Sequence, residues 1–438
     1  MKCAPEIIGL FWMVVVTAAH AQLTPADVSP MTPLGRVDTV FLAGNEKTKD
    51  YVILDEMSLR PGSVVTRNDI EFDRRRIYSI GLFTRVDITY DSLGGKRYLL
   101  VDVNERWFLF PVPIFGFRDG DPHRIYFGGG LVHTNVGGRN QKLFASLILG
   151  YDPSASISFV DPLIDHEERL FFSTGASFAR VKNKSVTSGD FQNLTYDLNG
   201  TVGKRFGFYN TAALNLGYQI IQVSDYEPGR TVSPSGRDAF LYMTASYTID
   251  SRDIAEYAMQ GSLASVYIGK IGFGWSDVNY LRYGIDLRLY LPLFRSLSLG
   301  ARASGTLVSG GVIPTYARVF FGYRERIRGH FFEVLEGEDL VVGSLELRYA
   351  VLPAETFIFH ELPVPMEFKV WRFGICLSAF VDAGAVWFRQ DGLQLEDFRR
   401  GQGVGLNFLL PYSYVVRIEY AWNAQWRGQW IVDFRGSF

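Results

Sequence analysis

Hydrophobic and polar residues alternate along the chain from residue 108 to residue 438, a pattern typical of β-strands with two different faces. We count sixteen alternating segments, and turn residues separate them. They cover residues 108–117, 124–133, 142–150, 154–161, 169–179, 194–205, 211–223, 239–249, 261–270, 280–291, 297–308, 339–350, 372–388, 403–410, 413–421 and 428–438. Because bacterial outer-membrane barrels have an even number of antiparallel strands, the pattern predicts an all-β membrane barrel of 16 antiparallel strands over residues 106–438.

The connections between these segments alternate in length, which indicates the two ends of a barrel. The connections at 292–296 and 411–412 are short, whereas those at 181–193, 224–238 and 309–338 are long and polar. Outer-membrane barrels have short periplasmic turns and long outer loops in this way. Residues 352–369 depart from the alternation, because they are long where a short turn is expected.

The last segment has an aromatic face and a charged face. Trp430, Val432, Phe434 and Phe438 share one face, and Asp433 lies on the other. This arrangement predicts a barrel wall between lipid and a wet lumen, with Phe434 and Phe438 as a C-terminal signal. A half-buried strand of a soluble sheet is the alternative interpretation.

The first 36 residues predict export. Residues 1–21 have the form of a signal peptide, in which an apolar run over 7–19 follows Lys2, and Ala19-His20-Ala21 is the cleavage site. The run is too short to span a membrane as a helix. We interpret residues 22–36 as a linker. The predicted location is therefore the periplasm, the outer membrane or the exterior.

Residues 37–105 predict a small α+β module in the order strand, helix, helix, strand, strand. The second helix begins at Thr66-x-x-Asp69, which has the form of a capping box, and it ends before Gly81. The last two strands meet at Gly94-Gly95, a hairpin signal. This module differs in pattern from the rest of the chain and is predicted to be a separate domain.

Composition and charge narrow the functional classes. Aromatic residues make up 15% of the chain, with 44 glycines and 23 tyrosines, as suits many strands with aromatic girdles. The net charge of -2 predicts no nucleic-acid partner. The sequence contains no nucleophile elbow, phosphate-binding loop or zinc-ligand spacing. We therefore expect no enzyme, with no catalytic residues, no metal site and no cofactor.

Two predicted strands carry acids toward the lumen. If Leu345 faces lipid, the alternation turns Glu346 inward, and the same argument turns Phe380 and Asp382 inward on the next strand. Two carboxylates inside a barrel need a cation or water. Arg328, in the long loop, can supply a planar donor fork. Hydration of each charge separately is the alternative.

Several motifs resemble those of the BamA/TamA superfamily of outer-membrane assembly and secretion barrels, also called the bacterial surface antigen family. The loop sequence Ile327-Arg328-Gly329-His330 is similar to the family's Val-Arg-Gly-Phe/Tyr motif. The strand sequence Phe380-Val381-Asp382-Ala383-Gly384 is similar to its Phe-x-Asp-x-Gly motif. Asp250-Ser251-Arg252-Asp253 and Phe159-Val160-Asp161-Pro162 resemble two further segments, and residues 37–105 resemble one POTRA domain.

The resemblance implies a contact between the long loop and the barrel wall. In the family the loop arginine folds into the lumen and meets acids on the strands, so Arg328 is expected to contact Asp382 and Glu346. This chain departs from the family in two respects. His330 stands where the family motif has an aromatic residue, and there is one POTRA domain where well-known assembly members have several.

The function implied by the resemblance is insertion or translocation of other proteins at the cell outer membrane, with the POTRA domain in the periplasm. The expected partners are outer-membrane lipid, unfolded or extended client polypeptides that pair with the POTRA sheet edge, and periplasmic accessory proteins. One alternative is a passive outer-membrane porin or transporter with an accessory periplasmic domain, which predicts a wide lumen without an inward Arg328 loop. Another alternative is a soluble, secreted β-rich binding protein.

Overall fold

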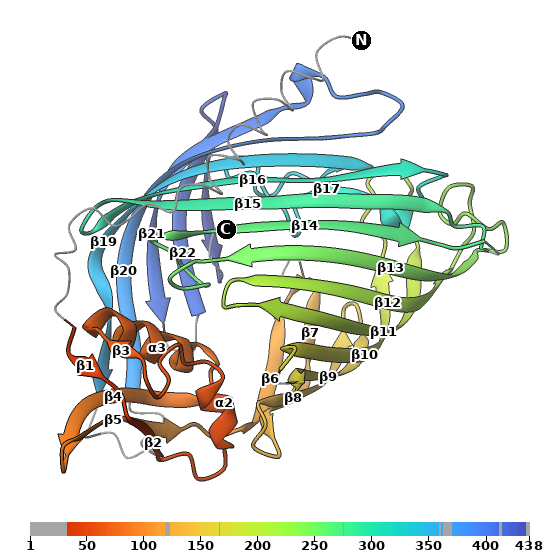
Figure 1. Ribbon diagram of the computed structural model, residues 1–438. Coiled ribbons are helices and arrows are strands. Elements are labelled where there is room, and N and C mark those ends of the chain that lie inside the picture. The colour runs from red at the N-terminus through yellow and green to blue at the C-terminus, as the bar shows by residue number, and fades with distance from the viewer. Residues whose placement is uncertain are drawn as a thin grey trace. The chain divides into compact units, whose positions relative to one another are not determined.

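The computed structural model describes residues 33–118, 123–165, 167–274, 276–358, 361, 370–410 and 414–434. The predicted signal peptide, residues 22–32 of the predicted linker and Phe438 lie outside the described residues. The chain divides into two compact units (Figure 1). One unit contains the residues up to 45 and residues 53–104, and the other contains residues 46–52 and 105–438.

Within residues 33–105, the described part of the N-terminal region, there are a three-stranded sheet and two helices. Its elements are β1 (Gly35–Arg36), β2 (Thr39–Ala43), α2 (Asp50–Leu54), β3 (Val64–Val65), α3 (Arg67–Ser79), β4 (Phe83–Leu93) and β5 (Lys96–Glu105). The sheet order is β2-β5-β4, with β2 parallel to β5, and β1 pairs with β3. The predicted order of strands and helices is present, and the short β1–β3 pair is an addition to it. In the described part of the chain, no helix is long and apolar enough to cross a membrane.

Local sequence explains where α3 begins and ends. The Thr66 hydroxyl accepts a hydrogen bond from the Asp69 amide at 3.3 Å, and the Asp69 carboxylate accepts one from the Thr66 amide at 2.9 Å. This capping box satisfies amides that have no partner within the helix. Gly81 follows the helix with φ of 78°, a left-handed conformation that glycine adopts without a steric penalty. The predicted helix signals are therefore confirmed.

A buried carboxylate on α3 holds the segment between the two helices. Asp73 accepts hydrogen bonds from the Ser58 amide and hydroxyl, each at 2.7 Å, and from the Leu59 amide at 3.0 Å. The side chain of Asp73 is fully buried, beside an apolar core that includes Ile77 and Phe83. Because a buried carboxylate needs partners, these three donors compensate for the burial of Asp73.

In the described residues, the largest sheet has sixteen strands, joined antiparallel in chain order from β6 to β23 (Figure 1). They are β6 (Leu109–Phe117), β7 (Ile125–Val136), β8 (Gln141–Gly150), β9 (Ser154–Asp165), β10 (Leu170–Lys182), β11 (Gln192–Phe206), β12 (Asn210–Val223), β13 (Arg237–Asp250), β14 (Gly261–Ile271), β15 (Tyr280–Phe294), β16 (Leu297–Gly310), β19 (Asp339–Ile358), β20 (Val370–Trp387), β21 (Arg399–Leu410), β22 (Tyr414–Asn423) and β23 (Gly428–Asp433). Each predicted segment corresponds to one of these strands, so the prediction of a 16-stranded antiparallel barrel is confirmed.

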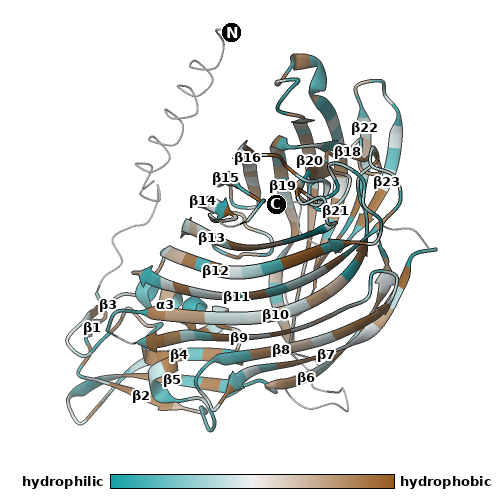
Figure 2. Ribbon diagram, turned by 90° about the vertical axis from the view of Figure 1, so that its right-hand side faces the viewer, coloured by the Kyte–Doolittle hydropathy of each residue, from teal (hydrophilic) through white to brown (hydrophobic). Residues whose placement is uncertain are grey.

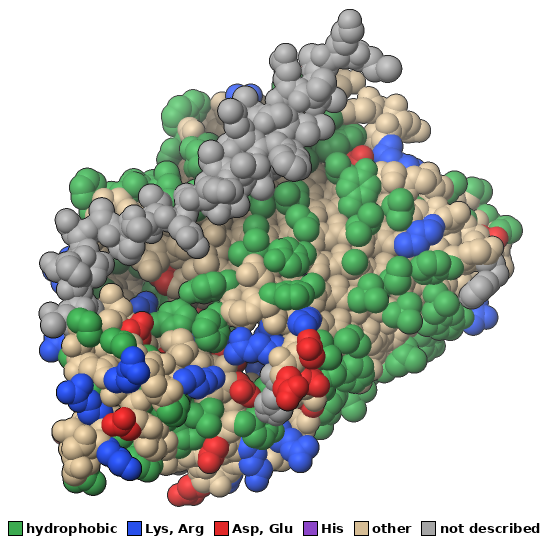
Figure 3. Space-filling view, viewed as in Figure 1, with side chains coloured by type: hydrophobic (Ala, Val, Ile, Leu, Met, Phe, Trp, Pro, Cys, Tyr) green, Lys and Arg blue, Asp and Glu red, His purple; other side chains and the backbone are tan. Residues whose placement is uncertain are grey.

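The outer face of this sheet is apolar. Figure 2 shows hydrophobic residues along its strands, and Figure 3 shows hydrophobic side chains gathered over them. Trp430 and Val432 of β23 and Phe434 directly after it are exposed, whereas Ile431 is fully buried. Asp433 points to the inner side, where Arg417 of β22 binds its carboxylate at 2.8 Å. This alternation is the one that a strand between lipid and a polar lumen requires.

Two parts of the structure differ from the sequence prediction. Residues 352–369 were expected to form a long connection, but β19 continues to Ile358 and β20 begins at Val370. Register shifts after Ala350 and after Leu352 absorb the extra residues, so pairing continues beyond the irregular part. The long loop after β16 also contains a short hairpin of β17 (Val319–Phe321) and β18 (Leu335–Gly337) that the pattern did not predict.

Replacement of Asp73 by alanine is expected to lower the free energy of unfolding of the N-terminal domain by about 2–4 kcal/mol, because buried donors lose their acceptor. Thr66→Ala removes only the helix cap, and a loss of about 1 kcal/mol is expected. Urea unfolding of a fragment of residues 33–105, followed by circular dichroism, measures both losses. Equal losses for the two variants would contradict the role assigned to the buried carboxylate.

Candidate functional site

Strands β19 and β20 turn charged residues into the lumen. On β19, Glu346 and Arg348 are buried, whereas Leu345 between Ser344 and Glu346 is exposed on the outer face. On β20, Asp382 is buried on the inner face. The pleat of the two strands and their register therefore place the carboxylates of Glu346 and Asp382 on one side of the sheet.

Arg328, from the connection between β16 and β19, reaches both carboxylates. Its Nε and Nη2 atoms donate to the two oxygens of Asp382 at 2.7 and 2.8 Å. Its Nη1 atom donates to Glu346 at 2.5 Å and to Glu419 of β22 at 3.1 Å. The guanidinium carbon lies 3.5 Å from the centre of the Phe380 ring. The planar fork thus meets three acids and an aromatic face at once, which a lysine ammonium cannot do.

The charges around Arg328 form one connected network. Arg348 donates to the second oxygen of Glu346 at 2.9 Å. Arg417 donates to both oxygens of Glu419 at 3.0 and 2.9 Å. Three arginines therefore bind four carboxylates. The arginines are Arg328, Arg348 and Arg417, and the carboxylates belong to Glu346, Asp382, Glu419 and Asp433. Buried ion pairs of this kind contribute little net stability, but removal of one member leaves the others uncompensated.

Glycines make room for the loop on the inner face of β21. A Cβ atom at Gly401 would lie 1.4 Å from the carbonyl oxygen of Arg328. A Cβ atom at Gly403 would lie 2.6 Å from the Phe380 ring, and one at Gly384 of β20 would lie 2.7 Å from the Phe321 ring. Gly329 itself has φ of 101°. Gly401 and Gly384 thus leave room for the loop beside the wall, and Gly403 leaves room for the Phe380 ring that lies under Arg328.

The residues that flank Arg328 pack into two apolar clusters. Ile327 is buried with Phe321 and Leu340. His330 is not the buried aromatic of this loop. Its Nδ1 atom lies 2.5 Å from the carboxylate of Glu333, and Phe331 packs with Phe380, Ala421 and Ile431. In this chain a buried aromatic residue thus stands one position later than the aromatic residue of the family motif.

A second ion pair holds the same loop to β16. Arg302 donates to the two carboxylate oxygens of Glu325 at 2.9 and 3.2 Å. Arg302 also binds Asp286 of β15 at 3.1 Å, and Asp286 binds Arg288 at 2.6 Å. The loop is therefore attached to strands on both sides of its own connection.

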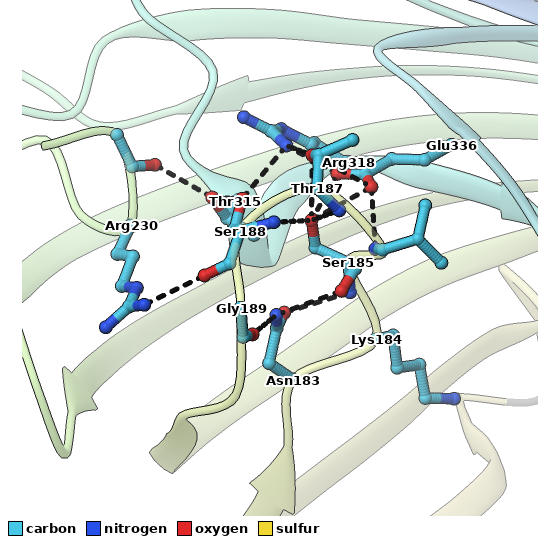
Figure 4. Close-up of polar contacts among 12 residues, drawn as sticks. Asn183, Lys184, Ser185, Thr187, Ser188, Gly189, Arg230, Thr315, Arg318 and Glu336 are labelled. Carbon is cyan, nitrogen blue, oxygen red and sulfur yellow. Dashed lines mark hydrogen bonds and ion pairs between the residues drawn. The ribbon is translucent and has the colours of Figure 1, made fainter. Parts of the chain in front are cut away.

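The hairpin of β17 and β18 within the loop forms hydrogen bonds with the connection between β10 and β11 (Figure 4). The Glu336 carboxylate accepts hydrogen bonds from the Ser185 hydroxyl at 2.7 Å and from the Val186 amide at 2.9 Å, and it pairs with Arg318. Burial favours the neutral acid, but the hydrogen bonds from Arg318 and Ser185 outweigh it and lower the pKa of Glu336. Arg230 also donates to the Ser188 carbonyl at 2.8 Å, which joins the connection between β12 and β13 to this group.

The structure brings together the residues that sequence reasoning selected. Arg328, Asp382, Glu346 and Phe380 meet in one cluster. Sequence reasoning missed the partners on β21 and β22, namely Glu419, Arg417 and the glycines 401 and 403. Alternating glycines in Gly401-Gln402-Gly403-Val404-Gly405 and the inward parity of Arg417 and Glu419 were the available signals. Phe434 is exposed at the end of β23, and Phe438 lies outside the described residues.

Comparison with known proteins defines the class. A family model described as the Omp85 superfamily domain matches residues 135–429, and a POTRA model, described as surface antigen variable number repeat, matches residues 35–106. The chain therefore belongs to the Omp85 superfamily. It is an outer-membrane barrel protein whose POTRA domain lies in the periplasm.

One relative matches most of the chain at low sequence identity. The chain is 24% identical over 411 residues to the outer membrane protein assembly factor BamA of Neorickettsia risticii (strain Illinois). The match covers 88% of this chain and 52% of that protein. This chain thus spans about half the length of that relative.

Solved structures of two kinds share the fold. BamA from Haemophilus ducreyi lacking POTRA domains 1-3 matches with a TM-score of 0.58 and 16% identity, over 91% of this chain and 83% of that chain. CdiB from Acinetobacter baumannii matches with a TM-score of 0.54 and 15% identity, over 91% and 73%. CdiB from Escherichia coli matches with a TM-score of 0.55 and 12% identity, over 91% and 74%.

Gly401→Ala is expected to displace the loop, because the added methyl group overlaps the backbone of Arg328. Limited proteolysis of the membrane-inserted protein should then cleave residues 322–334 faster than in the unaltered chain. Gly200→Ala is the matched control, since its Cβ atom would have no neighbour closer than 3.9 Å within β11 and its surroundings. Equal cleavage of the two variants would show that β21 does not determine the loop's position.

Arg328 and Asp382 are expected to be energetically coupled. Each single substitution by alanine should cost about 3–5 kcal/mol, because it leaves a partner charge buried, and the double variant should cost less than the sum. Arg328→Lys should recover only part of the loss, because lysine lacks the fork. Thermal unfolding in detergent and loop cleavage measure the cycle. A strictly additive double variant would disprove the coupling.

Proposed function

We propose that the protein inserts or translocates other proteins at the outer membrane. The observation that carries this proposal is the docking of Arg328 on Asp382 and Glu346 inside a barrel of the Omp85 superfamily. Relatives named for outer-membrane protein assembly, and the CdiB structures, have the same fold. Because this chain spans about half of the assembly factor's length, the activity is a proposal for this chain.

The proposed division of the chain follows the sequence. Residues 1–21 are the signal peptide, residues 22–36 the linker, residues 37–105 the POTRA domain and residues 106–438 the barrel. We propose that the POTRA domain receives clients, that outer-membrane lipid surrounds the barrel, and that periplasmic accessory proteins assist. No cofactor and no catalytic chemistry are needed for strand addition.

Client capture is proposed to use the POTRA sheet edge. In the described sheet, β2 and β4 are the edge strands, with β5 between them. An edge strand offers backbone donors and acceptors to an extended polypeptide, so recognition depends little on the client's side chains. This mechanism suits a protein that handles many unfolded clients.

A passive porin or transporter is the second candidate. It requires an open lumen, whereas the Arg328 loop here is attached to strands β16, β19, β20 and β22 by ion pairs. The inward loop therefore favours the assembly or secretion function over passive diffusion.

Depletion of the protein, followed by comparison of the outer-membrane proteome, tests the proposal. An assembly factor should leave many barrel proteins reduced, and a dedicated secretion barrel should leave one or a few exported proteins missing. Re-expression of the unaltered chain or of the Gly200→Ala control should restore them, whereas Arg328→Ala should not. A proteome that does not change, together with slower uptake of small solutes, would instead indicate a porin.

A further inference from the structure

The connection between β13 and β14, residues 251–260, folds into the lumen, and we call it the inner turn. Its residues Tyr257 and Ala258 are almost fully buried. Tyr257 packs with Cys376 of β20 and Val415 of β22, and Ala258 packs with Tyr290 of β15. The inner turn thus reaches from its own two strands to strands on the far side of the sheet order.

The inner turn is held in shape by its own polar residues. Arg252 donates to the two oxygens of Asp250 at 2.9 and 2.7 Å, and to the Ala255 carbonyl at 2.9 Å. Asp253 accepts hydrogen bonds from the amides of Ile254 at 2.9 Å and Met259 at 3.1 Å. These local bonds present the carbonyl groups of residues 258 and 259 to the barrel wall.

Side chains from three strands donate hydrogen bonds to the inner turn. Ser298 of β16 donates to the Met259 carbonyl at 2.5 Å, and Arg348 of β19 donates to the Ala258 carbonyl at 2.6 Å. Asn407 of β21 donates to the Tyr257 hydroxyl at 3.3 Å. The Arg348 guanidinium also lies over the Tyr257 ring, 4.3 Å from its centre.

The inner turn and the connection that carries Arg328 enter from opposite ends of the barrel. We call this connection, residues 311–338, the outer loop. The strands from β13 to β19 are antiparallel neighbours in chain order, so successive connections alternate between the two ends. The connection from β13 to β14 and the connection from β16 to β19 are separated by two others, which places them at opposite ends. Both nevertheless end on the same stretch of β19.

One carboxylate joins the two segments. Glu346 accepts from Arg328 of the outer loop through one oxygen, at 2.5 Å. Through its other oxygen it accepts from Arg348 at 2.9 Å, and Arg348 in turn holds Ala258 of the inner turn. A change in the position of Arg348 therefore acts on the inner turn directly and on the outer loop through Glu346.

We propose that Arg348 is a positioning residue that couples the inner turn to the outer loop, so that two segments from opposite ends of the barrel occupy the lumen together. The inference goes beyond the proposed function and does not depend on which clients the protein handles. Its physical basis is that a buried guanidinium must keep all of its partners or strand a charge.

Hydrogen exchange of the full-length protein in lipid nanodiscs, followed by mass spectrometry, tests this proposal. Arg348→Gln is expected to accelerate exchange about tenfold or more in residues 251–260 and also in residues 322–334. Two control variants separate the segments. Ser298→Ala should affect the inner turn alone, because it removes one bond to Met259. Arg302→Gln should affect the outer loop alone, because it removes the bonds to Glu325.

Faster exchange in both segments of Arg348→Gln supports the coupling, and faster exchange in the inner turn alone, or in neither segment, overturns it. Arg348→Lys provides a second test if the glutamine variant does not assemble. It keeps a positive charge beside Glu346 but lacks the fork, so the outer loop should return to nearly the original rate while the inner turn stays fast. An inner turn that exchanges at the original rate in Arg348→Lys would also overturn the proposal.

Discussion

A guanidinium that is buried among carboxylates controls the inside of this barrel. Arg328 is almost fully shielded from solvent and keeps its charge by binding acids on three strands, β19, β20 and β22. The loop that carries it cannot leave without exposing unpaired acids, and the acids cannot be replaced singly without stranding the arginine. One side chain thus anchors the middle of a connection of nearly thirty residues.

The wall of the barrel is adapted to this charge. Gly401 of β21 lets the loop backbone approach the sheet, and Gly403 leaves room for Phe380 of β20, which lies under the guanidinium. Elsewhere in the loop, Glu325 is bound by Arg302 of β16, and Glu336 is bound by the connection between β10 and β11. Several weak or costly polar contacts, distributed along one loop, specify a single arrangement more effectively than they add stability.

The occupied lumen also bears on function. Under the proposed function, the edge strands β2 and β4 of the POTRA sheet offer an extended client a backbone surface. Pairing with such an edge does not depend on particular client side chains. The charged interior of the barrel, by contrast, keeps the protein's own segments in place.

The sequence by itself determined the number of strands, the inward parity of Glu346 and Asp382, and the helix cap at Thr66, because these features repeat or act over a few residues. The resemblance in the loop motif pointed to Arg328. Only the tertiary structure showed that Glu419 and Arg417 join the cluster, and that Arg348 reaches the inner turn, 90 residues earlier in the chain. Those contacts depend on how the sheet curves and on which connections fold inward. Neither property leaves a periodic trace in a single sequence, because it arises from packing between strands that are distant along the chain.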